Sequence, residues 1–135
     1  MKRLSCVGVA ILGIIPCVAR SASADEIVPL VCAVVDLASC APGAECQRET
    51  AGGVNAPELV IVDLKLQQIT GKRPNGELLS TQIERMTRSE NLLVLEGVQD
   101  ALSWTMTVTD DTGQMSLGVV GSGVAFAAFG RCMPK

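Results

Sequence analysis

The feature that most constrains the fold is a strict alternation of apolar and polar residues late in the chain. From Leu102 to Thr109, apolar residues take the even positions, and serine or threonine takes the odd ones. Successive side chains of a β-strand point to opposite faces, so this period of two predicts a strand with one buried face. A turn signal at 110–113 follows, and Met115, Leu117 and Val119 continue the apolar face on the returning strand.

Further strand-like segments precede and follow this hairpin, separated by turn signals. They are Val28–Val35, Val60–Leu66, Leu92–Val98 and Val124–Phe129, the last apolar on both faces and therefore expected in the middle of a sheet. The segment 47–57 is expected to be irregular surface chain. We predict an all-β fold: an antiparallel meander of six or seven strands, forming a strongly curved sheet or small barrel stapled by disulfides. Glycines at 118, 121 and 123 are expected to permit the bulge that curls it.

One segment, 77–88, has two interpretations. Leu79, Ile83 and Met86 fit helical spacing, and the segment contains good helix formers. Asn75-Gly76 before it and an apolar β-rich run after it favour a hairpin strand instead. We predict a strand.

The N-terminal residues are typical of an export leader. Lys2 and Arg3 precede a short apolar run, and Ala22 and Ala24 form an A-x-A cleavage site. We predict that residues 1–24 are a signal peptide cleaved after Ala24, and that 25–135 form a single exported β domain, periplasmic or secreted. No second apolar stretch long enough to span a membrane follows the leader.

Four of the six cysteines follow the predicted leader: Cys32, Cys40, Cys46 and Cys132. An even number in a small exported domain predicts disulfides, and three pairings are possible. We favour Cys40–Cys46, because the five residues between them include Pro42-Gly43 and predict a tight turn. This leaves Cys32–Cys132, which would join the first strand to the last.

Charge and composition weigh against several classes of partner. All 14 acidic residues follow the predicted leader, which contains three of the 11 basic residues, so the exported part is more acidic than the whole chain with its net charge of −3. Nucleic-acid binding depends on neutralising phosphates with basic residues, so we predict no nucleic-acid partner. The chain has no histidine and no C-x2-C pair, so we predict no metal site and no cofactor.

No convincing catalytic set is present, and we predict a protein that is not an enzyme. Asp111-Thr112-Gly113 matches the D-T-G of retroviral-type aspartic proteases, but Asp110 before it and Gln114 after it depart from that pattern. A turn is the favoured interpretation. Ser122 lies between two glycines, yet it lacks the outer glycines of a nucleophile elbow, and the chain has no histidine base. Asp63 and Glu96 are the other acidic candidates. Trp104 is predicted to belong to the core.

Several segments resemble a group of small exported proteobacterial proteins with no assigned activity. The resemblance is carried by Leu30–Asp36 with Cys40 and Cys46, by Leu93–Val98, by Trp104, and by Phe129-Gly130-Arg131-Cys132. It covers nearly all of the chain after the leader. It implies a fold and no reaction.

These observations favour a non-catalytic binding or interaction domain of the bacterial envelope, whose partner is an unknown envelope protein or a small molecule. One alternative is an envelope inhibitor of a hydrolase such as lysozyme, suggested by Ser122-Gly123 in a glycine-rich loop. A second is a carrier of a small apolar ligand, which needs a cavity. The chain has two phenylalanines, one tryptophan and no tyrosine, so Val, Leu and Met side chains are expected to fill the interior and leave no cavity. The remotest alternative is an aspartic protease-like enzyme using Asp111.

Overall fold

The computed structural model describes residues 27–135, and within this range every helix or strand assigned is a β-strand. The all-β prediction is confirmed, but six or seven strands is too few. The predicted signal peptide lies outside the described residues. The ten strands are β1 (Leu30–Cys40), β2 (Gln47–Glu49), β3 (Leu59–Asp63), β4 (Gln68–Lys72), β5 (Leu78–Gln82), β6 (Arg85–Ser89), β7 (Leu92–Gln99), β8 (Leu102–Thr109), β9 (Gln114–Gly121) and β10 (Val124–Pro134).

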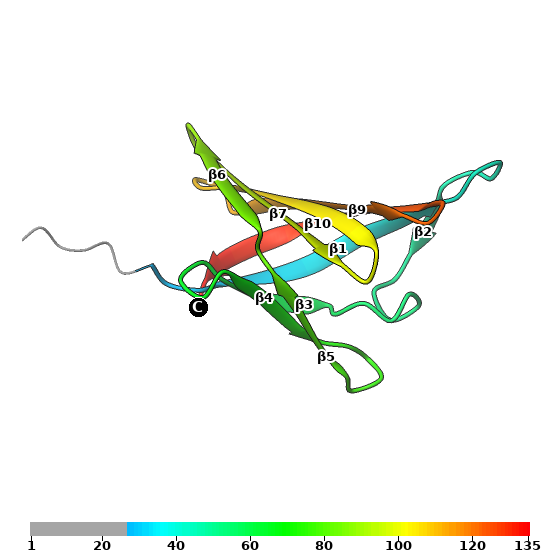
Figure 1. The fold of residues 1–135 in the computed structure, drawn as a ribbon, viewed down its shortest axis with the longest axis horizontal. Coiled ribbons are helices and arrows are strands. Elements are labelled where there is room, and N and C mark those ends of the chain that lie inside the picture. Colours follow the sequence, from blue (N-terminus) through cyan, green and yellow to red (C-terminus); the bar gives the residue numbers. More distant parts are fainter. Residues whose placement is uncertain (1–26) are drawn as a thin grey trace, which may run out of the picture.

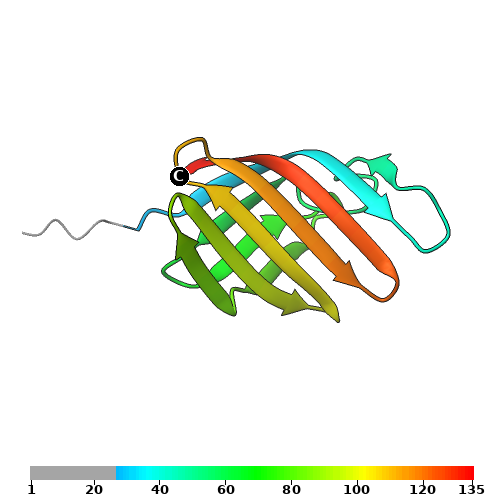
Figure 2. The ribbon, with the colours of Figure 1, turned by 90° about the horizontal axis from the view of Figure 1, so that it is seen from above.

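The strands form one antiparallel sheet that curls into a half-barrel (Figures 1 and 2). Its order is β5-β4-β3-β1-β10-β9-β8-β7-β6, with β2 paired to β1 beside this path. The two edge strands, β5 and β6, are consecutive in the chain. At the bend between them the Ile83 N–H donates to the Gln67 carbonyl and the Glu84 N–H donates to the Glu96 carbonyl, both at 2.8 Å. The bend therefore ties one edge of the sheet to the other and keeps it curled.

The predicted strand 60–66 ends earlier than expected, at Asp63. The Asp63 carboxylate accepts hydrogen bonds from the backbone N–H groups of Lys65 and Leu66, at 3.0 and 2.8 Å, and Gln67 has a positive φ of 52°. An Asx-type turn formed without glycine or proline thus separates β3 from β4. Leu66 is exposed in this turn, so its expected place on the apolar face is wrong.

The segment 77–88 is strand, as predicted, but it forms two strands, β5 and β6, with the bend between them. The segment 47–57 is less irregular than expected, because β2 pairs with residues 37–39 of β1. Its later part is also not simply surface chain, since Ala51 and Pro57 are buried.

The strand β10 lies in the middle of the sheet between β1 and β9, as its two apolar faces predicted. The expected bulge near the glycines of β9 is not found, because β9 and β10 pair in regular register. The register shift lies instead in β1, between Val34 and Asp36. Val35 is the extra residue there and is 75% exposed. A bulge of this kind bends a strand and increases its twist, which suits a strongly curled sheet.

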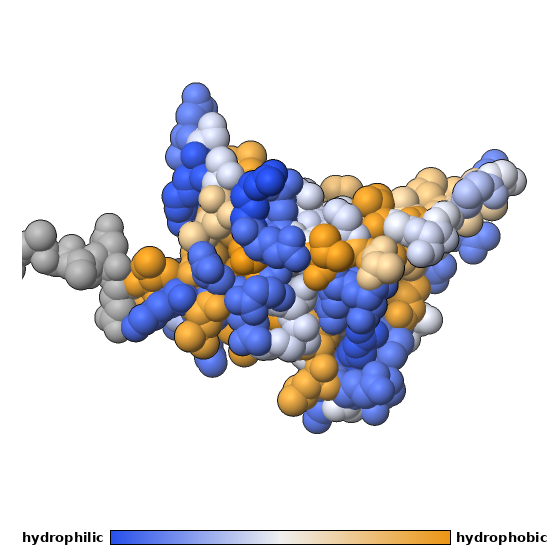
Figure 3. Space-filling view, viewed as in Figure 1, coloured by the Kyte–Doolittle hydropathy of each residue, from blue (hydrophilic) through white to orange (hydrophobic). Residues whose placement is uncertain are grey.

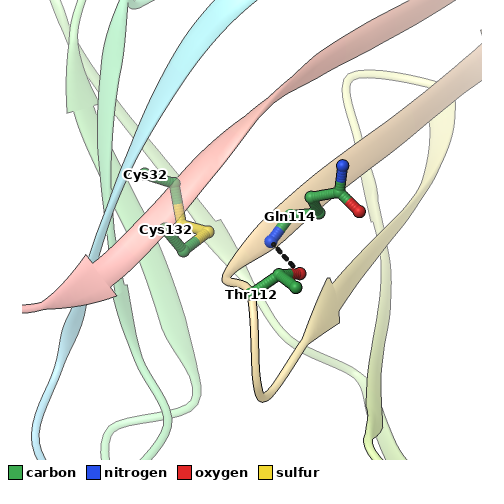
Figure 4. Close-up of a disulfide and its surroundings, with 4 residues drawn as sticks. All are labelled: Cys32, Thr112, Gln114 and Cys132. Carbon is green, nitrogen blue, oxygen red and sulfur yellow. Dashed lines mark hydrogen bonds between the residues drawn. A yellow bond between two sulfur atoms is a disulfide. The ribbon is translucent and has the colours of Figure 1, made fainter.

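Both predicted disulfides are present: Cys32–Cys132 and Cys40–Cys46. Cys32 and Cys132 face each other across β1 and β10 and belong to the buried core (Figure 4). The rest of that core comes from the inward faces of β3, β4, β7, β8 and β9 and from the β5–β6 bend: Val60, Val62, Ile69, Ile83, Leu93, Leu95, Trp104, Met106, Val108 and Met115.

Hydrophobic and hydrophilic residues are interspersed on the face seen in Figure 3 and do not gather into one patch. Across residues 27–135, no helix has the length and apolar character that crossing a bilayer requires.

Candidate functional site

One end of the curled sheet contains an apolar cavity of about 230 Å³. We call this the open end. It carries the β7–β8 turn at Asp100-Ala101, the β9–β10 turn at Ser122-Gly123 and the β4–β5 turn at 73–77, which lie on the same side of the molecule in Figure 1. The opposite or closed end carries the β8–β9 turn and the disulfide Cys32–Cys132, as Figure 4 shows.

The cavity follows from the inward alternation of the strands. Apolar side chains line it from β1 (Val34, Leu37), β3 (Val60), β4 (Ile69), β5 (Leu79), β8 (Leu102, Trp104, Met106), β9 (Met115, Leu117, Val119) and β10 (Phe126, Ala128). The register places Ala128 opposite Leu37 on one side and Leu117 on the other, and Leu117 opposite Met106. One small residue among larger neighbours leaves this layer unfilled. The expectation of a filled interior without a cavity is therefore wrong.

One polar contact lies within the wall. The indole N–H of Trp104 donates to the hydroxyl oxygen of Thr81 at 3.1 Å, and both residues are buried. It joins β8 to β5, which are not neighbours in the sheet. A side chain at Gly97 would approach the Trp104 ring to 2.5 Å, so the indole packs against a position that only glycine leaves free. Trp104 is a core residue, as predicted, and also lines the cavity.

The other polar lining residues lie in loops and turns at the open end or, for Gln99, at the end of β7: Asn55, Arg73, Gln99 and Asp100. Arg73 is half-buried, and its guanidinium donates a long hydrogen bond of 3.4 Å to the Asn55 carbonyl. Within residues 27–135 there are three ion pairs, Arg48–Asp36, Arg85–Glu96 and Arg88–Asp110, and Arg73 belongs to none of them. The cavity therefore has an apolar interior and an opening that carries one cation and one anion.

Asp111, the candidate protease residue, lies at the exposed tip of the β8–β9 hairpin. The neighbouring Thr112 hydroxyl accepts a hydrogen bond of 3.2 Å from the Gln114 backbone N–H (Figure 4). The Gly113 N–H donates to the Thr109 carbonyl at 2.7 Å. These contacts build a turn, the interpretation favoured from the sequence.

The other acidic candidates have local structural partners. Asp63 supports the β3–β4 turn described above, and Glu96 lies 3.4 Å from Arg85 across β6 and β7. Among the residues that the structure describes, no group of three or more His, Cys, Asp or Glu side chains could hold a metal ion. Ser122 lies in the exposed β9–β10 turn with a positive φ of 50°, and the inhibitor hypothesis built on it stays a prediction.

A second hollow, shallow and polar, lies outside the sheet beside Glu84, Arg85 and Glu96. The Arg85–Glu96 ion pair already satisfies two of its charged groups. The cavity at the open end is therefore the better candidate for a binding site.

The comparisons give no relative: no family model, no curated protein and no solved structure matches this chain. The resemblance to a group of exported proteins thus stays a prediction, and functional inference rests on the geometry of the cavity.

Sequence reasoning missed the polar residues at the opening. Asn55 lay in a segment expected to be irregular surface chain, and Arg73 is next to a turn signal with no motif around it. One feature could have indicated the cavity: the strand next to the β8–β9 hairpin, β10, has a small inward residue, Ala128. Its use would have required the strand register.

Proposed function

We propose that this protein is a non-catalytic binding protein that holds a small apolar molecule in the cavity at the open end. The observation that carries the proposal is the cavity itself, about 230 Å³ of space lined mainly by apolar side chains. Ligand sites are typically concave, mostly apolar and largely formed before binding. Of the functions compatible with the sequence, carriage of a ligand is the one that needs such a space.

The energetics support an apolar ligand over bound water. A buried water needs two to four polar partners, and the deep wall offers mainly Val, Leu, Met and Phe side chains. The Thr81 hydroxyl, which also lines the cavity, already accepts a hydrogen bond from Trp104. Each methylene moved from water into such a cavity contributes about 0.8 kcal/mol.

We include export in this proposal. Two disulfides are present, and such bonds persist in oxidising compartments such as the periplasm or the exterior of the cell. A signal peptide cleaved after Ala24 would deliver the chain there. Mass spectrometry of the protein recovered from a bacterial periplasm would test this directly, because a chain that still begins at Met1 contradicts it.

The chain contains its own reporter for binding, since its single tryptophan, Trp104, lines the cavity. Titration of the oxidised protein with 1-octanol should change Trp104 fluorescence in a saturable way. Burial of the eight carbon atoms of 1-octanol contributes up to about 6 kcal/mol before the costs of association, so we expect a modest affinity. Native mass spectrometry should also show a small molecule that co-purifies with the protein.

A matched pair of variants separates the cavity from the outer surface. Val119→Phe places a larger side chain into the cavity from β9, whereas Val120→Phe adds the same ring on the outer face, where Val120 is 52% exposed. We expect the first variant to lose octanol binding and the second to retain it. Ala128→Leu reaches the same space from β10 if Val119→Phe does not fold. Binding that survives a filled cavity, or no binding by the wild type, would contradict the proposal.

A further inference from the structure

We infer that the ligand is a medium-chain amphiphile with an anionic head, a carboxylate of about eight carbons whose head pairs with Arg73. This inference rests on the proposed function and adds the chemical class of the ligand. It starts from the distribution of polarity, because the deep cavity is apolar while Asn55, Arg73, Gln99 and Asp100 lie at the opening. A ligand that satisfies both regions has an apolar chain and one polar end.

Arg73 determines the sign of the head. It is the only basic residue that lines the cavity, it is half-buried, and no carboxylate among residues 27–135 forms an ion pair with it. Its long hydrogen bond to the Asn55 carbonyl leaves most of its donors available. A planar guanidinium matches a carboxylate through two parallel hydrogen bonds, which are stronger than neutral ones.

Asp100 is the competing charge at the opening and would favour a cationic head. It lies in the two-residue β7–β8 turn and is exposed, so an ion pair formed there is screened by water and contributes little. The half-buried Arg73 suffers less screening. The acidic character of the chain opposes any anion at long range, so the head must make its contact directly at Arg73.

The size of the cavity limits the length of the chain. A cavity of about 230 Å³ is smaller than the roughly 300–1,000 Å³ of drug-sized ligand sites, so we expect it to accommodate a single apolar chain of about eight carbons. Each added methylene should strengthen binding about fourfold until the cavity is filled. Affinity should therefore rise from hexanoate to octanoate and level off beyond it.

The test compares octanoate, 1-octanol and octylammonium at neutral pH, with Trp104 fluorescence and calorimetry as readouts. We expect wild-type protein to bind octanoate about tenfold more tightly than octylammonium. Arg73→Gln should lose about tenfold in octanoate affinity and keep its affinity for octanol. Lys72→Gln is the matched control, since Lys72 is the neighbouring basic residue, is exposed and does not line the cavity.

Two patterns of failure are distinguishable. If octanol binds but octanoate is no better than octylammonium, or Arg73→Gln loses nothing, the anionic head is wrong and the apolar binding function stands. If none of the three molecules binds wild-type protein, the proposed function fails as well. An equal loss in Lys72→Gln and Arg73→Gln would also overturn the inference, because general charge and not contact would then explain it.

Discussion

The two ends of the curled sheet are built from the same strands and differ in how completely they are filled. At the closed end Cys32, Val62 and Leu93 are each at most 1% exposed. At the open end inward residues such as Leu117 and Val119 of β9 are only partly buried and line the cavity. The alternation of apolar and polar residues determines which face of each strand points inward. The size of the inward side chains determines whether the interior is fully packed.

The covalent ties differ as well. At the closed end, Cys32–Cys132 crosses the interior face of β1 and β10 within the core. Near the open end, Cys40–Cys46 closes only the short β1–β2 loop and fixes nothing across the cavity. One end is therefore stapled through its core, and the other is held by strand pairing and by the Trp104–Thr81 contact. We infer that stability resides mainly at the closed end and binding at the open one.

The largest expected difference between the two ends is in the loss of stability when each disulfide is removed. The linked residues are 100 apart for Cys32–Cys132 and six apart for Cys40–Cys46. Loop-closure entropy then predicts losses of about 5 and about 2 kcal/mol in the free energy of unfolding. Double alanine variants of each pair, compared by urea denaturation, measure the difference. Equal losses would show that the closed end has no special role.

The next largest effect should come from truncating one leucine at each end. Leu93→Ala removes a side chain that is fully buried at the closed end and should cost about 3 kcal/mol. Leu117→Ala enlarges a space that already exists, so we expect about 1 kcal/mol. Chemical denaturation of the two variants tests this, with unchanged m-values as the control for two-state unfolding. A Leu117 loss as large as that of Leu93 would mean that the open end is packed as tightly as the closed end.

The smallest expected effect is a gain in stability. The two-residue β7–β8 turn has positive φ at both positions, 50° at Asp100 and 64° at Ala101. Alanine pays a steric cost there that glycine avoids. Ala101→Gly should raise the free energy of unfolding by about 0.5 to 1 kcal/mol. The same substitution at Ala127, within β10, should lower it by a similar amount. A loss at both positions would contradict the strain argument.

Much of the fold could be predicted because local patterns determine it. The alternation around Trp104 gave the β8–β9 hairpin, and the five residues between Cys40 and Cys46 gave the disulfide pairing. The β3–β4 turn was missed because Asp63 builds it from a side chain, without the glycine or proline that marks most turns. The β5–β6 bend was missed because its two hydrogen bonds, to Gln67 and Glu96, reach residues distant in sequence.

The cavity could not be predicted in the same way. It depends on Ala128 lying in one layer with Met106 and Leu117, and that layer exists only once the register of β8, β9 and β10 is known. Arg73 likewise becomes a candidate through its place at the opening and not through a motif. Inward or outward direction is a local property of a strand, whereas the space left inside the sheet is a property of the whole assembly.

The neighbouring ends of the described chain also make this fold suitable for circular permutation. The Lys135 backbone N–H donates to the Pro29 carbonyl at 2.8 Å, so a short linker could connect the two termini without disturbing β1 or β10. New termini placed at the exposed β6–β7 turn, Glu90-Asn91, would leave every strand intact and lie at one edge of the sheet, where β7 is three strands away from β10. In such a permutant Cys32 and Cys132 become close in sequence, which converts the longest covalent loop of the molecule into one of its shortest.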